Sequence, residues 1–187
     1  MSTPQETRQK ANERMETALE HLRKDLAGVR TGRASLALLD GIKVDYFGTP
    51  TPLKQVATLS VPESRQIAIQ PWEPALIPEI EKAIRTSDLG LNPGNDGKAI
   101  RLNLPPLTEE RRRDLVKHTR KLGEDTRVAV RNIRRDANDE LKRLSKDGKL
   151  SEDDLKKIHD ETQKLTDQHI QKIDDILKNK ESEIMEK

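Results

Sequence analysis

The stretch that decides the fold is residues 108–145, TEERRRDLVKHTRKLGEDTRVAVRNIRRDANDELKRLS. It contains no proline and follows Pro105-Pro106, where a helix cannot continue because the residue before each proline is pushed into an extended conformation. Thr108 is a good N-cap, and the two glutamates after it suit the positive end of a helix dipole. The pattern predicts one long helix from Thr108 to about Ser145, which ends at an Asp-Gly-Lys turn at 147–149.

The two faces of this predicted helix differ in chemistry. At 100° per residue, with Arg113 at zero, four apolar side chains fall within about 20° of the 180° line: Leu115, Leu122, Ala129 and Ile133. The opposite face is basic, and we call its seven members the basic stripe: Arg113, Lys117, Arg120, Arg127, Arg131, Arg134 and Arg135. The stripe extends over roughly 33 Å, and only Glu124 interrupts it near its centre.

The basic stripe favours a polyanionic partner. Residues 107–149 carry 14 basic and 9 acidic side chains, whereas residues 150–187 carry 7 and 11. A merely solvated face, which is the alternative interpretation, usually mixes charges of both signs. Arginine makes forked contacts with phosphate. This helix has no aromatic residue, so contacts should go to phosphate and ribose, and binding should depend strongly on salt.

Two further amphipathic helices are predicted on either side. Apolar residues at steps of three and four mark the first: Ala11, Met15, Ala18, Leu22, Leu26 and Val29. Ser151 with Asp154 resembles a capping box that opens the last helix, which runs to about Met185. Its seam is Leu155, Ile158, Thr162, Leu165, His169, Ile173, Ile176 and Ile184. Three such helices bury their seams best against one another, as an elongated bundle.

Residues 31–105 have a different composition and predict a small inserted domain. Nine of the ten prolines lie between Pro50 and Pro106, and all three aromatic residues fall in the same region. Alternating apolar residues predict strands near 42–46, 67–69 and 100–104, and isoleucines at 77, 80 and 84 suit a short helix. Asp96-Gly97 is a plausible hairpin turn. Trp72 is expected in the core, with a partner-facing surface position as the alternative.

The predicted fold class is therefore α+β. Residues 1–30 and 106–187 form the three-helix bundle, and residues 31–105 form the inserted β/α/β domain. Two short segments cross the boundary, and such a boundary can act as a hinge. The residues assigned to that hinge are Arg30, Thr31, Gly32, Leu104, Pro105 and Pro106.

Several functional classes find little support. The chain has no cysteine, which excludes disulfides, thiolate zinc sites and cysteine nucleophiles. The four histidines lack metal-ligand spacing, His169 is expected in the core, and the glycines near 90–97 lack the Lys-Ser/Thr of a phosphate loop. No metal, cofactor or catalytic residue is expected. No apolar run could span a bilayer and MSTPQETRQK has no leader pattern, so we expect a soluble cytoplasmic protein.

Four segments are long and specific enough to indicate a family. They are VRTGRAS (29–35), LLDGIKVDYFGTPTPL (38–53), SDLGLNPGNDGKAIRLNLPPLTEERRRDL (87–115) and VAVRNIRRDAND (128–139). The chain resembles the bacterial ribosome recycling factor family over essentially its whole length. The resemblance implies an L-shaped protein whose three-helix bundle carries an inserted β/α/β domain.

The resemblance also implies a function. The family acts after termination with elongation factor G, whose GTP hydrolysis drives separation of the ribosome into subunits so that mRNA and tRNA leave. The bundle is expected to bind large-subunit RNA, and the inserted domain is expected to meet the elongation factor and swing about the hinge. By motif, Arg131, Arg134, Arg135, Arg30 and Arg33 are expected to bind ribosomal RNA. The first three also belong to the basic stripe.

Two other interpretations remain open from the residues alone. A coiled-coil adaptor would pair its basic face with acidic helices and would dimerise along its seam, whereas a closed bundle should stay monomeric. A hydrolase would use the carboxylates of the last helix, although these form a negative face rather than a converging pair.

Overall fold

The computed structural model describes residues 3–186, which divide into two compact units. One unit contains residues 3–31 and 109–186, and the other contains residues 32–108. Each has its own hydrophobic core. The architecture is α+β, as predicted: three long helices form one unit, and antiparallel sheets with one α-helix form the other.

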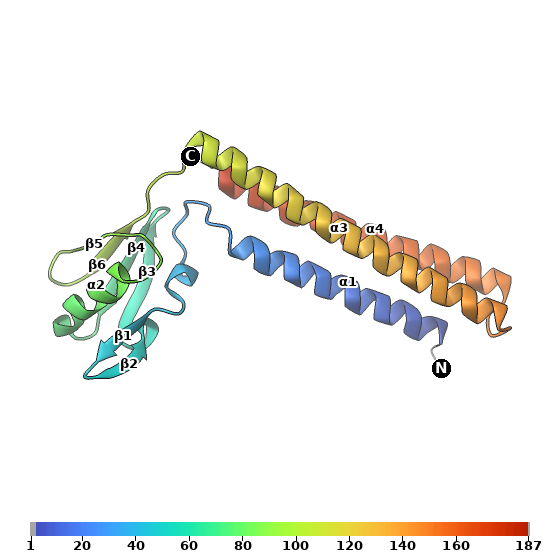
Figure 1. The fold of residues 1–187 in the computed structure, drawn as a ribbon, viewed down its shortest axis with the longest axis horizontal. Coiled ribbons are helices and arrows are strands. Elements are labelled where there is room, and N and C mark those ends of the chain that lie inside the picture. The colour runs from blue at the N-terminus through green and yellow to red at the C-terminus, as the bar shows by residue number, and fades with distance from the viewer. Residues whose placement is uncertain (1–2, 187) are drawn as a thin grey trace. The chain divides into compact units, whose positions relative to one another are not determined.

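The first unit is a bundle of α1 (Pro4–Ala27), α3 (Glu109–Lys146) and α4 (Glu152–Met185). The three helices run side by side, and each contacts the two others (Figure 1). All three contribute to one core, which includes Met15, Leu19, Leu22, Val130, Ile133, Ile173 and Leu177. The three helices therefore bury their apolar faces against one another, although Leu19, Val130 and Leu177 of this core lie outside the predicted seams.

The ends of these helices follow local capping chemistry. Thr3 and Glu6 form a capping box, in which the Glu6 N–H donates to Thr3 Oγ1 at 3.2 Å and the Thr3 N–H donates to Glu6 Oε2 at 2.8 Å. Ser151 caps α4, as predicted, by accepting from the Asp154 N–H at 3.1 Å. The predicted limits of α3 and α4 agree with the observed ones to within one residue.

The second unit contains two antiparallel sheets. A hairpin of β1 (Lys43–Tyr46) and β2 (Thr49–Pro52) forms the smaller one. The larger has the order β3-β4-β6-β5, with β3 at Ala57–Glu63, β4 at Gln66–Pro71, β5 at Pro93–Asn95 and β6 at Ile100–Asn103. The helical elements are α2 (Ile77–Arg85) and three short 3-10 helices, η1 (Leu36–Leu39), η2 (Leu53–Gln55) and η3 (Pro74–Leu76).

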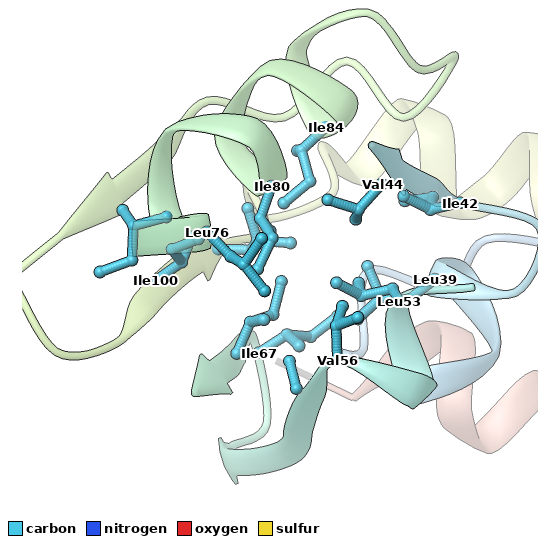
Figure 2. Packing of buried hydrophobic residues seen from close by; sticks show 14 residues of the cluster. Leu39, Ile42, Val44, Leu53, Val56, Ile67, Leu76, Ile80, Ile84 and Ile100 are labelled. Carbon is cyan, nitrogen blue, oxygen red and sulfur yellow. The ribbon is translucent and has the colours of Figure 1, made fainter. Parts of the chain in front are cut away.

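The core of this unit lies under α2. Ile80 and Ile84 are fully buried, and they point into a cluster that includes Val44 and Ile67 (Figure 2). Ile67 and Ile69 of β4 and Ile100 and Leu102 of β6 are all buried, as the period-two alternation predicts. Both sheets thus contribute to this core, the hairpin through Val44 and the four-stranded sheet through these four residues.

Most of the predicted elements of this unit are confirmed, including the turn at Asp96-Gly97. Asp96 Oδ1 accepts from the Ala99 and Lys98 N–H groups at 2.9 and 3.0 Å, and these bonds lower the pKa of the Asp96 carboxyl. The expectation that Trp72 lies in the core is wrong, because 64% of the residue is exposed. Strands β2, β3 and β5 were not predicted. Proline or glycine interrupts any alternation in β2 and β5, whereas β3 was missed although Ala57, Leu59 and Val61 alternate with polar residues.

Candidate nucleic-acid interface on α3

The buried face of α3 is displaced from the predicted one. Its buried residues are Leu115, Thr119, Gly123, Val130, Ile133, Ala137, Leu141 and Leu144. On the helical wheel these centre near 240° rather than 180°. Leu122 and Ala129, placed at the centre of the predicted face, are only half-buried. The rotation of about 60° carries one edge of the basic stripe toward α4 and leaves the other edge facing solvent.

Arg127 lies on the edge that turns toward α4. Its side chain is only 23% exposed, and its Nε donates to Asp174 Oδ1 at 3.1 Å, with a second bond from Nη2 to the same oxygen. Nη1 donates to Glu124 Oε2 at 3.2 Å. The Asp174 bond is the main reason that the pKa of the Arg127 guanidinium is raised. Arg127 therefore joins α3 to α4 rather than standing open on the surface.

Three other arginines of the stripe pair with carboxylates but remain accessible. Arg120 makes a forked contact with Glu181, from Nε to Oε1 at 2.8 Å and from Nη2 to Oε2 at 3.1 Å. The Arg113 side chain, 71% exposed, pairs with Glu109 of its own helix at 3.1 Å. Arg131 pairs with Glu124 at 3.2 Å. Hydrogen bonds from Arg127 and Arg131 lower the pKa of the Glu124 carboxyl, so this carboxylate stays charged within the stripe.

The rest of the stripe is less constrained. Lys117 and Arg135 are exposed, and neither lies within 4.0 Å of a carboxylate oxygen among residues 3–186. Arg134 is half-buried and donates to the neutral Gln163 Oε1 at 3.0 Å. With the buried face centred near 240°, the solvent side centres near 60° and also includes Lys121 and Lys142. Lys121, at about 80° on the wheel, was missed because the predicted buried face was centred on Leu122 and Ala129, whereas Lys142, at about 20°, lies within the predicted basic face but beyond the last residue assigned to it.

A glycine sets the spacing between α3 and α4 at this place. A Cβ built on Gly123 would lie 2.3 Å from Leu177 Cδ1, so only a residue without a side chain allows this approach. Leu177 lines an open groove of about 670 Å³ together with Arg120, Arg127 and Glu181. The close contact brings the carboxylates of α4 within reach of the arginines of α3.

The residues assigned by motif or to the hinge lie in or near the segments between the two units. Arg30 and Arg33 are exposed, and each takes part in an interaction within the chain. Gly32 has φ +76°, and a Cβ there would lie 3.0 Å from the Leu107 side chain. The Leu104 N–H donates to the Arg65 carbonyl at 2.8 Å, which ties Leu104 to the second unit. Thr31 is half-buried, and Pro105 and Pro106 are exposed.

The histidine on the α4 seam is a core residue, as predicted. His169 is buried, with Nδ1 2.8 Å from the Leu165 carbonyl oxygen and Nε2 2.9 Å from Glu16 Oε2. Burial alone would raise the pKa of the Glu16 carboxyl, but hydrogen bonds from His169 and Lys172 outweigh it and lower the pKa. This network joins α1 to α4.

Other chemistry finds no assembled site in the described part of the chain. No group of three or more His, Asp or Glu side chains within residues 3–186 is arranged to hold a metal ion. The α4 carboxylates Asp174 and Glu181 pair with arginines of α3 instead of converging on each other. None of the helices in residues 3–186 combines the length and the apolar character needed to cross a bilayer.

Comparison with known proteins identifies the family. A profile of the family described as ribosome recycling factor matches residues 22–185. The chain is 57% identical over 178 residues to the ribosome-recycling factor of Geobacillus kaustophilus (strain HTA426), covering 95% of this chain and 96% of that protein. It is 59% identical over 176 residues to that of Nitratidesulfovibrio vulgaris (strain DP4), covering 94% and 95%.

Solved structures of related proteins have the same fold. The solution structure of a ribosome recycling factor, 45% identical, superimposes with a TM-score of 0.75 and covers 99% of this chain and 98% of that one. The T. thermophilus ribosome recycling factor, in models with the E. coli elongation factor G bound to the E. coli post-termination complex, is 49% identical. It gives a TM-score of 0.65 over 99% and 100% of the two chains. The chain therefore belongs to the ribosome recycling factor family.

Proposed function

We propose that this chain disassembles the post-termination ribosome together with elongation factor G and GTP, and that it docks on large-subunit ribosomal RNA through the basic face of α3. Family membership supports the first part, because a relative 49% identical to this chain is described in models with elongation factor G bound to the post-termination complex. The basic face of α3 is the observation that carries the second part. The chain acts by binding and not as an enzyme, and it works as a monomer.

The solvent side of α3 has an excess of cations over carboxylates, although Glu110, Glu124 and Asp139 are also exposed on it. Lys117, Arg131 and Arg135 are exposed on it, and Lys121 and Lys142 extend it along the helix. Arginine forks match phosphate oxygens, and a row of cations on a rigid helix can follow an RNA backbone without reading its sequence. No aromatic residue lies on α3, so base stacking has no part in this contact.

The ion pairs on this face do not prevent it from binding phosphate. Ion pairs exposed to water are weak and are screened by salt, so a surface dense in phosphate can replace a single carboxylate. Arg113, Arg120 and Arg131 are of this kind, because their side chains stay between 45% and 71% exposed while paired. Arg127 is different, since Asp174 holds it against α4 while Glu124 of its own helix also pairs with it. We assign Arg127 mainly to the bundle and the others to RNA.

A salt titration of binding to isolated large subunits tests this assignment. Arg131→Ala and Arg135→Ala should each weaken binding and reduce the slope of log K against log salt concentration by about 0.7–0.9, the value for one lost phosphate contact. Their melting temperatures should move by less than about 2 °C, since both side chains are exposed. Arg127→Ala should instead lower the melting temperature and change the slope less.

The matched control for this titration is Arg14→Ala on α1. Arg14 is an exposed arginine in an ion pair with Asp136, at 3.1 Å, and it lies outside the stripe. Its removal changes the net charge by the same amount as Arg131→Ala. If Arg14→Ala, Arg131→Ala and Arg135→Ala all had the same slope as the parent chain, α3 would have no special part in RNA binding.

We also propose that Arg30 and Arg33 add RNA contacts and that the segments around Gly32 and Pro105-Pro106 act as a hinge between the two units. The positive φ of Gly32 and the prolines support this, because they fix local turns while leaving only two short connections. Fluorophores placed on the two units should report more than one distance in solution. If the distance between the fluorophores were single and narrow both in the free chain and on the ribosome, the hinge proposal would be wrong.

A further inference from the structure

Three arginines of the basic stripe recur at steps of seven residues along α3, on the edge that faces α4: Arg120, Arg127 and Arg134. The first two pair with carboxylates of α4 that are also seven residues apart, Glu181 and Asp174. Seven residues are close to two helical turns, so antiparallel helices place side chains opposite one another at this interval. The next step of seven along α4 leads to Asp167. The repeat therefore predicts an ion pair between Arg134 and Asp167.

The ion pair expected at this third position does not form. Arg134 Nη1 donates to Gln163 Oε1 at 3.0 Å, and Gln163 Nε2 donates to Asp167 Oδ1 at 2.9 Å. No nitrogen of the Arg134 side chain lies within 4.0 Å of a carboxylate oxygen in the described chain, residues 3–186. Gln163, one helical turn before Asp167, thus stands between the cation and the carboxylate.

The chemistry of the two partners fixes the orientation of the Gln163 amide. A guanidinium can only donate hydrogen bonds, and a carboxylate can only accept them. The carbonyl oxygen of Gln163 must therefore face Arg134, and its NH2 group must face Asp167. A glutamate at this position would place a second carboxylate beside Asp167, and a lysine would repel Arg134. A neutral side chain with one acceptor end and one donor end satisfies both neighbours.

The bond to Gln163 holds Arg134 without cancelling its charge. It engages only Nη1, whereas Nε and Nη2 make no hydrogen bond within residues 3–186 and neither is fully buried. Nε and Nη2 form one of the forked edges with which arginine binds phosphate oxygens. In Arg120 and Arg127 the same two nitrogens are bonded to carboxylates of α4. Of these three arginines, Arg134 alone has this edge open.

We propose that Gln163 is a positioning residue for RNA binding, which holds the Arg134 guanidinium in place and keeps Asp167 from neutralising it, so that Nε and Nη2 can bind phosphate. The proposal rests on the proposed function, which assigns Arg134 to large-subunit RNA. It extends that site to an uncharged residue of α4 that acts through Arg134.

Salt-titrated binding of the full chain to isolated large subunits tests this role. Gln163→Ala should allow Asp167 to pair with Arg134 as Asp174 pairs with Arg127. Binding should then weaken, and the slope of log K against log salt concentration should fall by about 0.7–0.9, the value for one phosphate contact. Gln163→Glu puts a carboxylate directly on Arg134 and should reduce the slope by the same amount. Both variants should melt within about 2 °C of the parent chain, since Gln163 is exposed.

A rescue experiment separates this role from a merely structural one. Asp167→Asn in the Gln163→Ala background removes the carboxylate that would neutralise Arg134, so the slope should return to that of the parent chain. If Gln163 only tied α3 to α4, the second substitution would leave the slope of Gln163→Ala unchanged. Absence of rescue, or a parental slope for both Gln163→Ala and Gln163→Glu, would overturn the proposal.

Gln171 supplies the matched control. Its Nε2 donates to Asp175 Oδ1 at 3.2 Å, which is the same bond on the same helix, but neither side chain bonds to an arginine of α3 within residues 3–186. Gln171→Ala should have the parental slope, with or without Asp175→Asn. If Asp175→Asn raised the slope as much as Asp167→Asn does, the rescue would reflect net charge alone and the proposal would be wrong.

Arg134→Ala distinguishes failure of this proposal from failure of the proposed function. If Arg134→Ala weakens binding and the Gln163 variants do not, Arg134 binds RNA without help from Gln163, and only the present inference is wrong. If Arg134→Ala binds as tightly as the parent chain, Gln163 has no RNA contact to position. Arg131→Ala and Arg135→Ala would still decide whether α3 docks on RNA.

Discussion

Replacing Gly123 with alanine should destabilise the bundle, although alanine is the better helix former. The added Cβ would lie 2.3, 2.8 and 3.0 Å from Cδ1, Cδ2 and Cγ of Leu177, whereas carbon atoms in contact prefer about 3.5–4.0 Å. The whole branched end of Leu177 clashes, and the residue is only 5% exposed, so it has little room to turn.

The size of the effect follows from two opposing contributions. Overpacking of a buried site costs about 1–3 kcal/mol, and replacing a helical glycine by alanine returns about 1 kcal/mol. Since three atoms of Leu177 overlap with the new methyl group, we expect an overpacking cost in the upper half of its range, about 2–3 kcal/mol. The net loss is about 1–2 kcal/mol, or a melting temperature lower by roughly 2–8 °C. Circular dichroism at the helical minimum would measure it.

A double-mutant cycle shows whether Leu177 is the cause. Leu177→Ala alone should cost about 2–5 kcal/mol by opening a cavity. Adding Gly123→Ala to that variant should cost nothing or restore stability, because the new methyl group then enters the vacated space. Gly28→Ala is the control, since φ at Gly28 is −74° and its Cβ would lie 3.5 Å from the Asp25 carbonyl oxygen. Additive effects, or a stabilised Gly123→Ala variant, would refute the close-approach argument.

Two further predictions concern charge. Glu181→Gln frees Arg120 from its forked partner, so binding to large subunits should tighten at low salt and the salt slope should steepen by up to about 0.9; an unchanged slope would mean that Arg120 does not meet phosphate. Hydrogen bonds from His169 and Lys172 lower the pKa of the Glu16 carboxyl in the folded chain below its unfolded value of 4.5. The ionised carboxylate therefore stabilises the fold above pH 4.5, and this stabilisation is lost as the pH falls through the folded pKa. Glu16→Gln should therefore lose less stability than the parent chain between about pH 5 and pH 3 in urea titrations, and parallel losses would contradict this role.

The long helices could be predicted because their signals are local. Proline marks where α3 cannot extend, and Ser151 caps the start of α4. Strand β2 shows the limit, because its TPTP sequence has no apolar alternation and pairs with β1 only through the hairpin turn. Pairing partners of that kind are set by the rest of the sheet and not by the strand itself.

Trp72 was misplaced for a different reason. Composition favours burial of a lone tryptophan, and the residue does follow a strand whose isoleucines are buried. The alternation of β4 buries Ile67, Ile69 and Pro71, so Trp72, one residue further on, falls on the side that faces away from the core. A statistical preference for burial gives no information about the side of a strand on which a particular residue falls.

The basic stripe shows how packing separates residues that look equivalent in a sequence. Arg127 and Arg131 are one turn apart, and a helical wheel places them within about 40° of each other. Gly123 draws α4 onto one side of α3, which brings Asp174 to Arg127 but leaves Arg131 paired only with Glu124 of its own helix. Arg127 thus belongs to the helix–helix contact, while Arg131 remains 45% exposed. The sequence contains this information only in the position of a glycine, whose effect depends on a leucine 54 residues away. An arginine pattern therefore predicts that a helix binds phosphate, but the smallest residue on its buried side determines which arginines can reach it.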